Sequence, residues 1–192
     1  MAHPAGTSGS GAVMTRRSKE TRVVLGPVTM TDAPVLFRWI NDRELVLHSA
    51  AYRPVHEGSH REWVKGLSQR RDLVAFGIRM RRSQRLIGVC QLTAINPVSR
   101  SADLQIRIGD AAARGKGLGL EAVRLLVAFG FRDLNLHRVS LQVLATNRRA
   151  VRTYERAGFR LEGTLRDAAF VDGRFVDVLV MSLLEDELGA GR

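Results

Sequence analysis

Six consecutive residues near the middle of the chain have the composition of an anion-binding loop. They are Arg114, Gly115, Lys116, Gly117, Leu118 and Gly119. They lie between a segment that alternates like a strand and a longer segment with apolar residues at helical spacing. The free N–H groups at a helix N-terminus attract anions, and glycines let an anion come close to the backbone. This placement predicts a phosphate cradle.

Two nucleotide-binding patterns fit the loop poorly. A Walker loop has four residues between its first glycine and Gly-Lys, whereas five residues separate Gly109 from Gly115, and Gly117 stands where Ser or Thr is required. The dinucleotide fingerprint is matched by Gly117, Gly119 and Ala122, but no acidic residue ends the following strand segment. A glycine-rich turn without a ligand stays open on these six residues alone.

The charge of the chain indicates an anionic partner only weakly. The 192 residues carry 30 Lys+Arg against 19 Asp+Glu, a formal net charge of +11. Only three of the basic residues are lysines, and the arginines are spread along the chain, which is more typical of a coding bias than of a nucleic-acid surface. No zinc spacing, basic heptad region or aromatic platform accompanies the charge. We therefore expect no nucleic-acid partner.

The apolar segments and the single cysteine indicate where the protein is located and whether it holds a disulfide or a metal. The longest uncharged apolar run, residues 125–131, is far shorter than the roughly 20 residues that span a bilayer. The first twenty residues contain no signal-like apolar segment, so we expect no membrane association and a cytoplasmic protein. The single cysteine, Cys90, lies in an apolar run and is expected to pack as a small hydrophobe, with no metal site.

The hydrophobic pattern predicts an α/β fold in one domain. We expect a flexible tail at residues 1–20, a domain at 21–186 and a short C-terminal tail at 187–192. Strand-like segments are 22–25, 74–80, 86–95, 102–108, 138–144, 159–165 and 169–184, the last interrupted by an Asp172-Gly173 turn. Helices are expected after an N-cap at 31–34, over 56–70, over 118–134, and from Asn147 to Gly158. Helices and strands interleave, which indicates a mixed sheet.

The loop, followed by a strand, Asn147 and the run Thr153–Phe159, resembles the GNAT superfamily of acyl-CoA-dependent N-acetyltransferases. The resemblance extends from about residue 23 to 184, includes Leu25-Gly26-Pro27-Val28, and looks closest to the RimJ/RimL-like branch. It implies a mostly antiparallel central sheet of six to seven strands with about four helices. It also implies that the strands before and after the long helix splay apart around the pantetheine arm of the cofactor.

The resemblance implies acetyl-CoA as co-substrate, without a metal. The CoA pyrophosphate would lie on the backbone of residues 114–119, and the pantetheine arm would run along Gln105, Ile106, Arg107 and Ile108. Asn147 would hydrogen-bond the pantetheine. Capping the helix that follows needs the same Asn147 side chain, so both roles stay open.

The resemblance also suggests two catalytic residues. Tyr154 matches the tyrosine that protonates the departing CoA thiolate, although a helical tyrosine three residues after Val151 is also a typical core residue. Asp103 stands where many relatives carry a glutamate and could relay the acceptor's proton through water. Its alternative role is a solvated charge on the exposed strand face. No nucleophile–base pair suggests a covalent enzyme intermediate, so we expect direct attack of the amine in a ternary complex.

The acceptor is not fixed by the sequence. Its pocket is expected from residues 31–62 and the 166–177 hairpin, which mix acidic, basic and aromatic side chains. Deprotonation at pH 7 costs about 1.1 kcal/mol for an α-amine and about 4.6 kcal/mol for a lysine-like amine. We therefore expect a small-molecule amine such as an amino sugar or antibiotic, or a protein N-terminus, with polyamines left open. The alternative is a non-catalytic acyl-CoA-binding domain that acts as a sensor or scaffold, and either is compatible with a homodimer.

Overall fold

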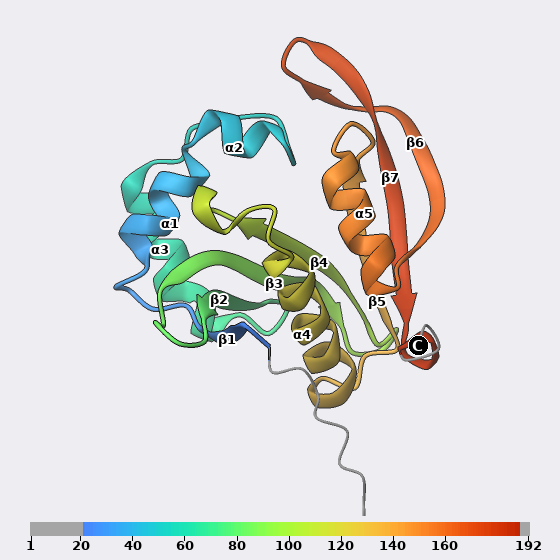
Figure 1. Cartoon of the computed structure of the whole chain (residues 1–192), viewed down its shortest axis with the longest axis horizontal. Helices are drawn as coiled ribbons and strands as arrows, with labels where there is room; N and C mark the ends of the chain where they lie inside the picture. The colour runs from blue at the N-terminus through green and yellow to red at the C-terminus, as the bar shows by residue number, and fades with distance from the viewer. Residues whose placement is uncertain (1–20, 189–192) are drawn as a thin grey trace, which may run out of the picture.

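A computed structural model describes residues 21–188 and contains one seven-stranded sheet, in the order β1-β2-β3-β4-β5-β7-β6 (Figure 1). The expected tail at 1–20 and residues 189–192 lie outside the described residues. All neighbouring strands are antiparallel except β4 and β5, which confirms the mixed, mostly antiparallel sheet. The strands are β1 (Val23–Pro27), β2 (Val74–Met80), β3 (Leu86–Asn96), β4 (Ser101–Ile108), β5 (Arg138–Leu144), β6 (Arg160–Val171) and β7 (Arg174–Leu184).

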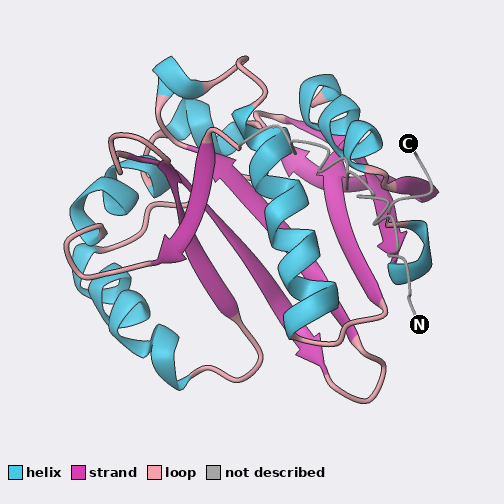
Figure 2. Cartoon of the chain, turned by 60° about the horizontal axis from the view of Figure 1, so that its bottom comes forward, coloured by secondary structure: helices cyan, strands magenta, loops and turns pink. Residues whose placement is uncertain are grey.

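The long helix α4 crosses one face of the sheet and closes the main core (Figure 2). Its apolar face carries Val123, Leu126 and Val127, which are almost completely buried. Burying each such side chain contributes about 1.5 to 3 kcal/mol. No helix within the described residues is long and apolar enough to span a membrane. The α-helices are α1 (Ala33–Ile40), α2 (Arg43–Leu47), α3 (Glu57–Gly66), α4 (Leu118–Asp133) and α5 (Arg148–Ala157).

The two central strands β4 and β5 pair over only three residues. The parallel register runs from Ser101 opposite Arg138 to Asp103 opposite Ser140, and then the strands diverge. Each keeps its other neighbour, because β4 pairs with β3 as far as Ile108 and β5 pairs with β7 as far as its last residue. The sheet therefore opens in a V while both of its halves stay hydrogen-bonded.

The β6–β7 hairpin extends beyond the rest of the sheet (Figure 1). Its tip is the expected turn, in which Asp172 and Gly173 have φ of 50° and 80°. Two successive positive φ angles are typical of the type I′ turn that matches strand twist. The register of β6 against β7 shifts between Leu165 and Ala169, which explains the gap between the two strand segments expected from the sequence.

Three local features differ from the sequence expectation. Helix α2 was not predicted, because only five residues form it and its start depends on Asp42, whose carboxylate accepts the Leu45 N–H at 3.1 Å. Helix α3 ends at Gly66, and residues 67–69 continue as a 3-10 turn. Asp32 precedes α1 without capping it with its side chain.

The Asp32 carboxylate instead anchors α1 to the sheet. It accepts hydrogen bonds from the Arg79 guanidinium at 2.7 and 2.9 Å and from the backbone and hydroxyl of Thr29. Burial alone would raise the pKa of Asp32, but these hydrogen bonds outweigh it and hold the pKa below the usual value. Asp32 therefore occupies the expected N-cap position, but its side chain forms an ion pair with Arg79 of β2 and does not cap the helix.

Candidate active site

The divergence of β4 and β5 opens a cleft of roughly 680 Å³. One wall is the C-terminal end of β4, and the others come from the glycine loop, the N-terminal turns of α4, the length of α5, and the end of α2. Most of the residues that the sequence assigned to the cofactor line this cleft. They are Ile106, Arg107, Ile108, Arg114, Gly115, Gly117, Leu118, Gly119 and Asn147, joined by Tyr154.

The glycine loop is held from both sides before any ligand arrives. Gly115 and Gly117 have φ of 80° and 79°, in the left-handed region that favours glycine, and Gly117 is the N-cap of α4. The Arg22 side chain donates to the Lys116 carbonyl oxygen at 2.8 Å. Arg114 donates to the carbonyl oxygens of residues 108 and 109 at 3.0 and 2.6 Å. The loop is therefore preorganised, with the first N–H groups of α4 free to bind an anion.

Arginines gather around the cleft, and no Asp or Glu lines it. Although the arginines are scattered along the sequence, tertiary folding brings the segments 107–114 and 148–156 together, so the prediction that they do not gather on one surface is wrong for this group. Part of this cluster could have been found from the sequence, because Arg148, Arg152 and Arg156 recur every four residues and so share one face of α5. The lining arginines are Arg107, Arg114, Arg148, Arg149, Arg152 and Arg156.

Tyr154 lies both in the main core and on the lining of the cleft. Its ring packs in the main core against Phe159, with centroids 5.9 Å apart. The Tyr154 hydroxyl forms no hydrogen bond within the described residues. Every fully buried polar side-chain atom in that part of the chain does have a partner, so the Tyr154 hydroxyl is not fully buried and reaches the cleft. Burial raises the pKa of Tyr154 to about 12.

Both polar atoms of the Asn147 side-chain amide form hydrogen bonds within the protein. Its oxygen caps α5 by accepting the Ala150 N–H at 3.1 Å, and its amide nitrogen donates to the His48 carbonyl oxygen at 2.8 Å. The helix-capping role is therefore present. A hydrogen bond from this amide nitrogen to pantetheine would have to replace its contact with α2.

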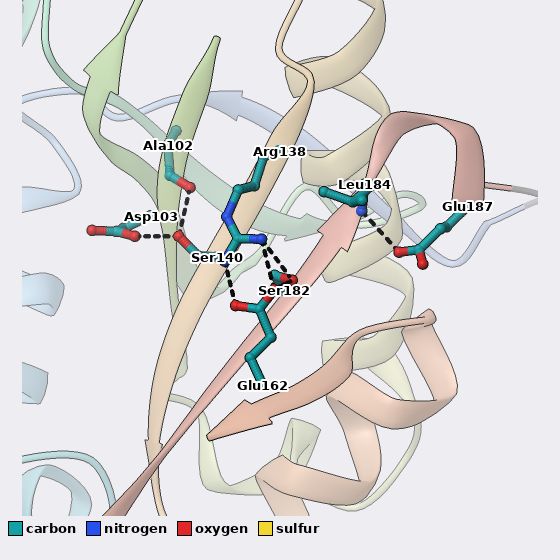
Figure 3. Close-up of polar contacts among 8 residues, drawn as sticks. All are labelled: Ala102, Asp103, Arg138, Ser140, Glu162, Ser182, Leu184 and Glu187. Atoms are coloured by element: carbon teal, nitrogen blue, oxygen red, sulfur yellow. Dashed lines mark hydrogen bonds and ion pairs between the residues drawn. The ribbon is translucent and has the colours of Figure 1, made fainter. Parts of the chain in front are cut away.

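Three predicted residues do not line the cleft. Lys116 is exposed and does not line the cleft, although it belongs to the loop. Gln105 is exposed and accepts from Gln91 at 2.7 Å. Asp103 is exposed at the last β4–β5 pair, where it accepts from the Ser140 hydroxyl at 2.6 Å (Figure 3). Asp103 thus lies at the apex of the V and not inside the cleft.

A smaller cavity of roughly 250 Å³ adjoins the cleft between α2 and the β6–β7 hairpin. Its lining shares His48, Thr146 and Asn147 with the cleft, so the two spaces meet at these residues. Across this cavity Arg43 of α2 donates to Asp172 at the hairpin tip at 2.8 Å. Both segments that the sequence assigned to the acceptor pocket therefore contribute to this cavity.

Comparison with known families agrees with this geometry. The family model for the acetyltransferase (GNAT) domain matches residues 22–160. The chain belongs to the GNAT acetyltransferase family. The splayed strands, the glycine loop and the Asn147 and Tyr154 positions named from the sequence all fall within this matched region.

Several relatives of known name share parts of this GNAT domain. The chain is 38% identical over 102 residues to a spermidine N(1)-acetyltransferase of Vibrio cholerae and 33% identical over 102 residues to the putative ribosomal N-acetyltransferase YdaF of Bacillus subtilis. These alignments cover 53% of the chain and only 58% and 55% of the relatives. The crystal structure of the Vibrio cholerae spermidine N-acetyltransferase in complex with CoA and spermine superimposes with a TM-score of 0.83 at 27% identity, covering 87% of this chain and 98% of that one.

The cleft suits acetyl-CoA, the co-substrate of GNAT enzymes. The N–H groups of the glycine loop fit a pyrophosphate, and the nearby arginines fit further phosphate oxygens. The Arg149 guanidinium lies on this side, 3.9 Å from the position of a Cβ on Gly115. The cofactor supplies an acetyl thioester. Among the described residues, no group of three His, Cys, Asp or Glu could hold a metal ion.

We expect Gly117→Val to abolish acetyl-CoA binding in a calorimetric titration. A side chain at φ of 79° strains the loop, and its Cβ would lie 3.3 Å from the Arg22 guanidinium, so the N–H groups lose their alignment. Gly58→Val in α3 is the control, since nothing lies within 4 Å of its Cβ position. Unchanged affinity in a folded Gly117→Val protein would contradict the assignment of the loop.

Proposed function

We propose that this protein transfers an acetyl group from acetyl-CoA to a primary amine by direct attack in a ternary complex. The observation that carries the proposal is the V between β4 and β5. On one side it meets the glycine loop and the arginines, and on the other it adjoins the cavity between α2 and the hairpin. A cofactor and an acceptor can therefore approach the same point from different sides. Cys90 is buried, and burial raises its pKa to about 12, so it offers no nucleophile.

Tyr154 is proposed to donate a proton or a hydrogen bond to the departing thiolate. With a pKa near 12 against about 8.5 for a thiol, full proton transfer is uphill by about 5 kcal/mol, compared with about 2 kcal/mol for an unperturbed tyrosine. The hydroxyl therefore acts mainly by stabilising the charge as it forms on sulfur. The same raised pKa keeps Tyr154 protonated over the whole pH range of an amine acetyltransferase assay.

We expect Tyr154→Phe to lower kcat about 100-fold while acetyl-CoA affinity and Tm stay near wild type. The substitution keeps the ring in the core and removes only the hydroxyl. The pH profile of the wild type should show no loss of rate from Tyr154 below about pH 11. The control is Tyr52→Phe, because Tyr52 lines neither cavity. Equal kcat values for Tyr154→Phe and wild type, with chemistry rate-limiting, would remove the hydroxyl from the reaction.

Asp103 is proposed to accept the acceptor's proton through water. Three features support this role: its position at the apex of the V, its exposure, and the Ser140 hydrogen bond that fixes one carboxylate oxygen. The other oxygen is available to water. Asp103 thus lies where the splayed strands would bring the reacting groups together, on the face away from α4.

We expect Asp103→Asn to lower kcat at neutral pH and to recover part of the rate in alkali. The neutral form of the amine becomes more abundant as pH rises, so the loss of a base matters less. Asp133→Asn, at the exposed end of α4, serves as the matched control. A wild-type pH–rate profile for Asp103→Asn would show that this carboxylate is only a solvated surface charge.

The acceptor is proposed to be a small-molecule amine or a protein N-terminus. Relatives of the chain are named for spermidine and for a ribosomal substrate. A cytoplasmic protein of the RimJ/RimL-like branch is part of the same proposal. A panel containing spermidine, amino sugars, aminoglycosides and N-terminal peptides, read by release of free CoA, tests the proposal. Turnover with any member separates an enzyme from a non-catalytic acyl-CoA sensor.

We also propose that the protein forms a homodimer through the β6–β7 hairpin. Leu161, Leu165, Phe170 and Phe175 are exposed there, on and beside the edge strand of the sheet. An apolar patch on a sheet edge favours pairing with another copy. The Vibrio cholerae spermidine N-acetyltransferase is known in a dodecameric structure.

Replacing both Phe170 and Phe175 with Ser should shift sedimentation from dimer to monomer. The control is Val98→Ser, which removes a still more exposed apolar side chain from the turn between β3 and β4. A wild-type protein that sediments as a monomer at micromolar concentration, or a double variant that stays dimeric, would contradict the hairpin interface.

A further inference from the structure

Arg107 occupies a distinct position among the arginines of the cleft. On β4, the neighbouring Ile106 and Ile108 pack against the main core under α4. Because successive side chains of a strand point to opposite faces, Arg107 projects from the face away from α4. There its guanidinium donates to the Ser49 hydroxyl at 3.2 Å, just beyond α2. Arg107 therefore lies on the acceptor side of the V.

The Arg107 guanidinium is half-buried without a carboxylate partner among the described residues. Burial lowers its pKa, and no charge within the described chain offsets this. Two other arginines on strands of the sheet are paired with carboxylates, Arg79 with Asp32 and Arg138 with Glu162. A neutral hydroxyl compensates a guanidinium only in part, so the fold bears the cost of an unneutralised cation at this position.

The phosphates of the cofactor belong to a different part of the cleft. They are assigned to the glycine loop, where Arg149 lies next to Gly115. Arg107 and Ser49 instead stand beside His48, which forms part of the boundary between the cleft and the smaller cavity. The free donors of Arg107 thus face the space through which an acceptor would reach the apex.

We propose that Arg107, with Ser49, binds an anionic group carried by the acceptor amine itself, either a carboxylate or a phosphate. This inference rests on the proposed acetyltransferase function and names the class of its acceptor. A planar guanidinium suits both groups, because its fork of donors matches two oxygens. A polyamine carries only positive charge and would meet the arginines of the cleft, whose lining has no carboxylate, while Asp172, which lines the adjoining cavity, is already paired with Arg43.

The test compares acceptors that differ only in the anionic group. For the carboxylate, the pair is phenylalanine and phenylalaninamide, and for the phosphate it is glucosamine 6-phosphate and glucosamine. We expect the wild type to favour the anionic member of one pair in kcat/KM, after correction for amine pKa, by about 10- to 100-fold. Arg107→Gln should remove this preference through the KM of the anionic acceptor, and Arg107→Lys should keep part of it. Arg82→Gln, in the exposed β2–β3 turn, is the control.

A second measurement separates this inference from the proposed function. N-acetylphenylalanine, N-acetylphenylalaninamide, N-acetylglucosamine 6-phosphate and N-acetylglucosamine are titrated into the CoA-saturated protein. The anion site is supported if one anionic ligand binds more tightly than its neutral partner and Arg107→Gln loses this difference. This holds even if no acceptor is turned over, because absent turnover would count only against the proposed acetyltransferase function. Equal binding within both pairs overturns the inference, as does an Arg107→Gln protein that loses acetyl-CoA affinity and keeps the acceptor preference.

Discussion

The active site depends on a break in hydrogen bonding at the centre of the sheet. After Asp103 and Ser140, β4 and β5 no longer pair, although both strands continue for several residues. Backbone N–H and C=O groups along the diverging edges are then left without a strand partner, and such groups require one. The pantetheine arm of acetyl-CoA carries amides that can supply it. The V is therefore a pairing site left open within a sheet that is otherwise complete.

The other parts of the site take their positions from this divergence. Helix α4 follows β4 after a short 3-10 turn and the glycine loop, and α5 follows β5 after three residues, so both helix N-termini lie at the open end of the V. The ion pair of Arg22 with Glu121 and the Arg22 contact with Lys116 hold the loop to β1. Positive charge accumulates where the fold supplies no carboxylate, which suits a polyanionic cofactor at one end and, by our inference, an anionic acceptor at the other.

Much of the fold and part of the site could be predicted from local sequence patterns. Alternation identified β4, and its strict period of two correctly placed Asp103 and Arg107 on the face opposite Ile106. The glycine loop followed from residue types at fixed spacing. Helix α2 was missed because five residues carry no period, and the ion pair of Asp32 was missed because its partner is 47 residues away. The arginine-lined cleft and the apex position of Asp103 depend on strand pairing, which one strand alone does not reveal. The roles of Tyr154, Asp103 and Asn147 stay predictions.

Hydrogen–deuterium exchange with and without acetyl-CoA tests most directly that the V is the cofactor site. Slower exchange is expected in the diverging end of β4, residues 104–108, and in the loop at 114–119, because both would gain hydrogen-bond partners. The β6–β7 hairpin provides an internal reference and should exchange at the same rate in both states. Protection confined to other segments, or none at saturating acetyl-CoA, would contradict the assignment of the cleft.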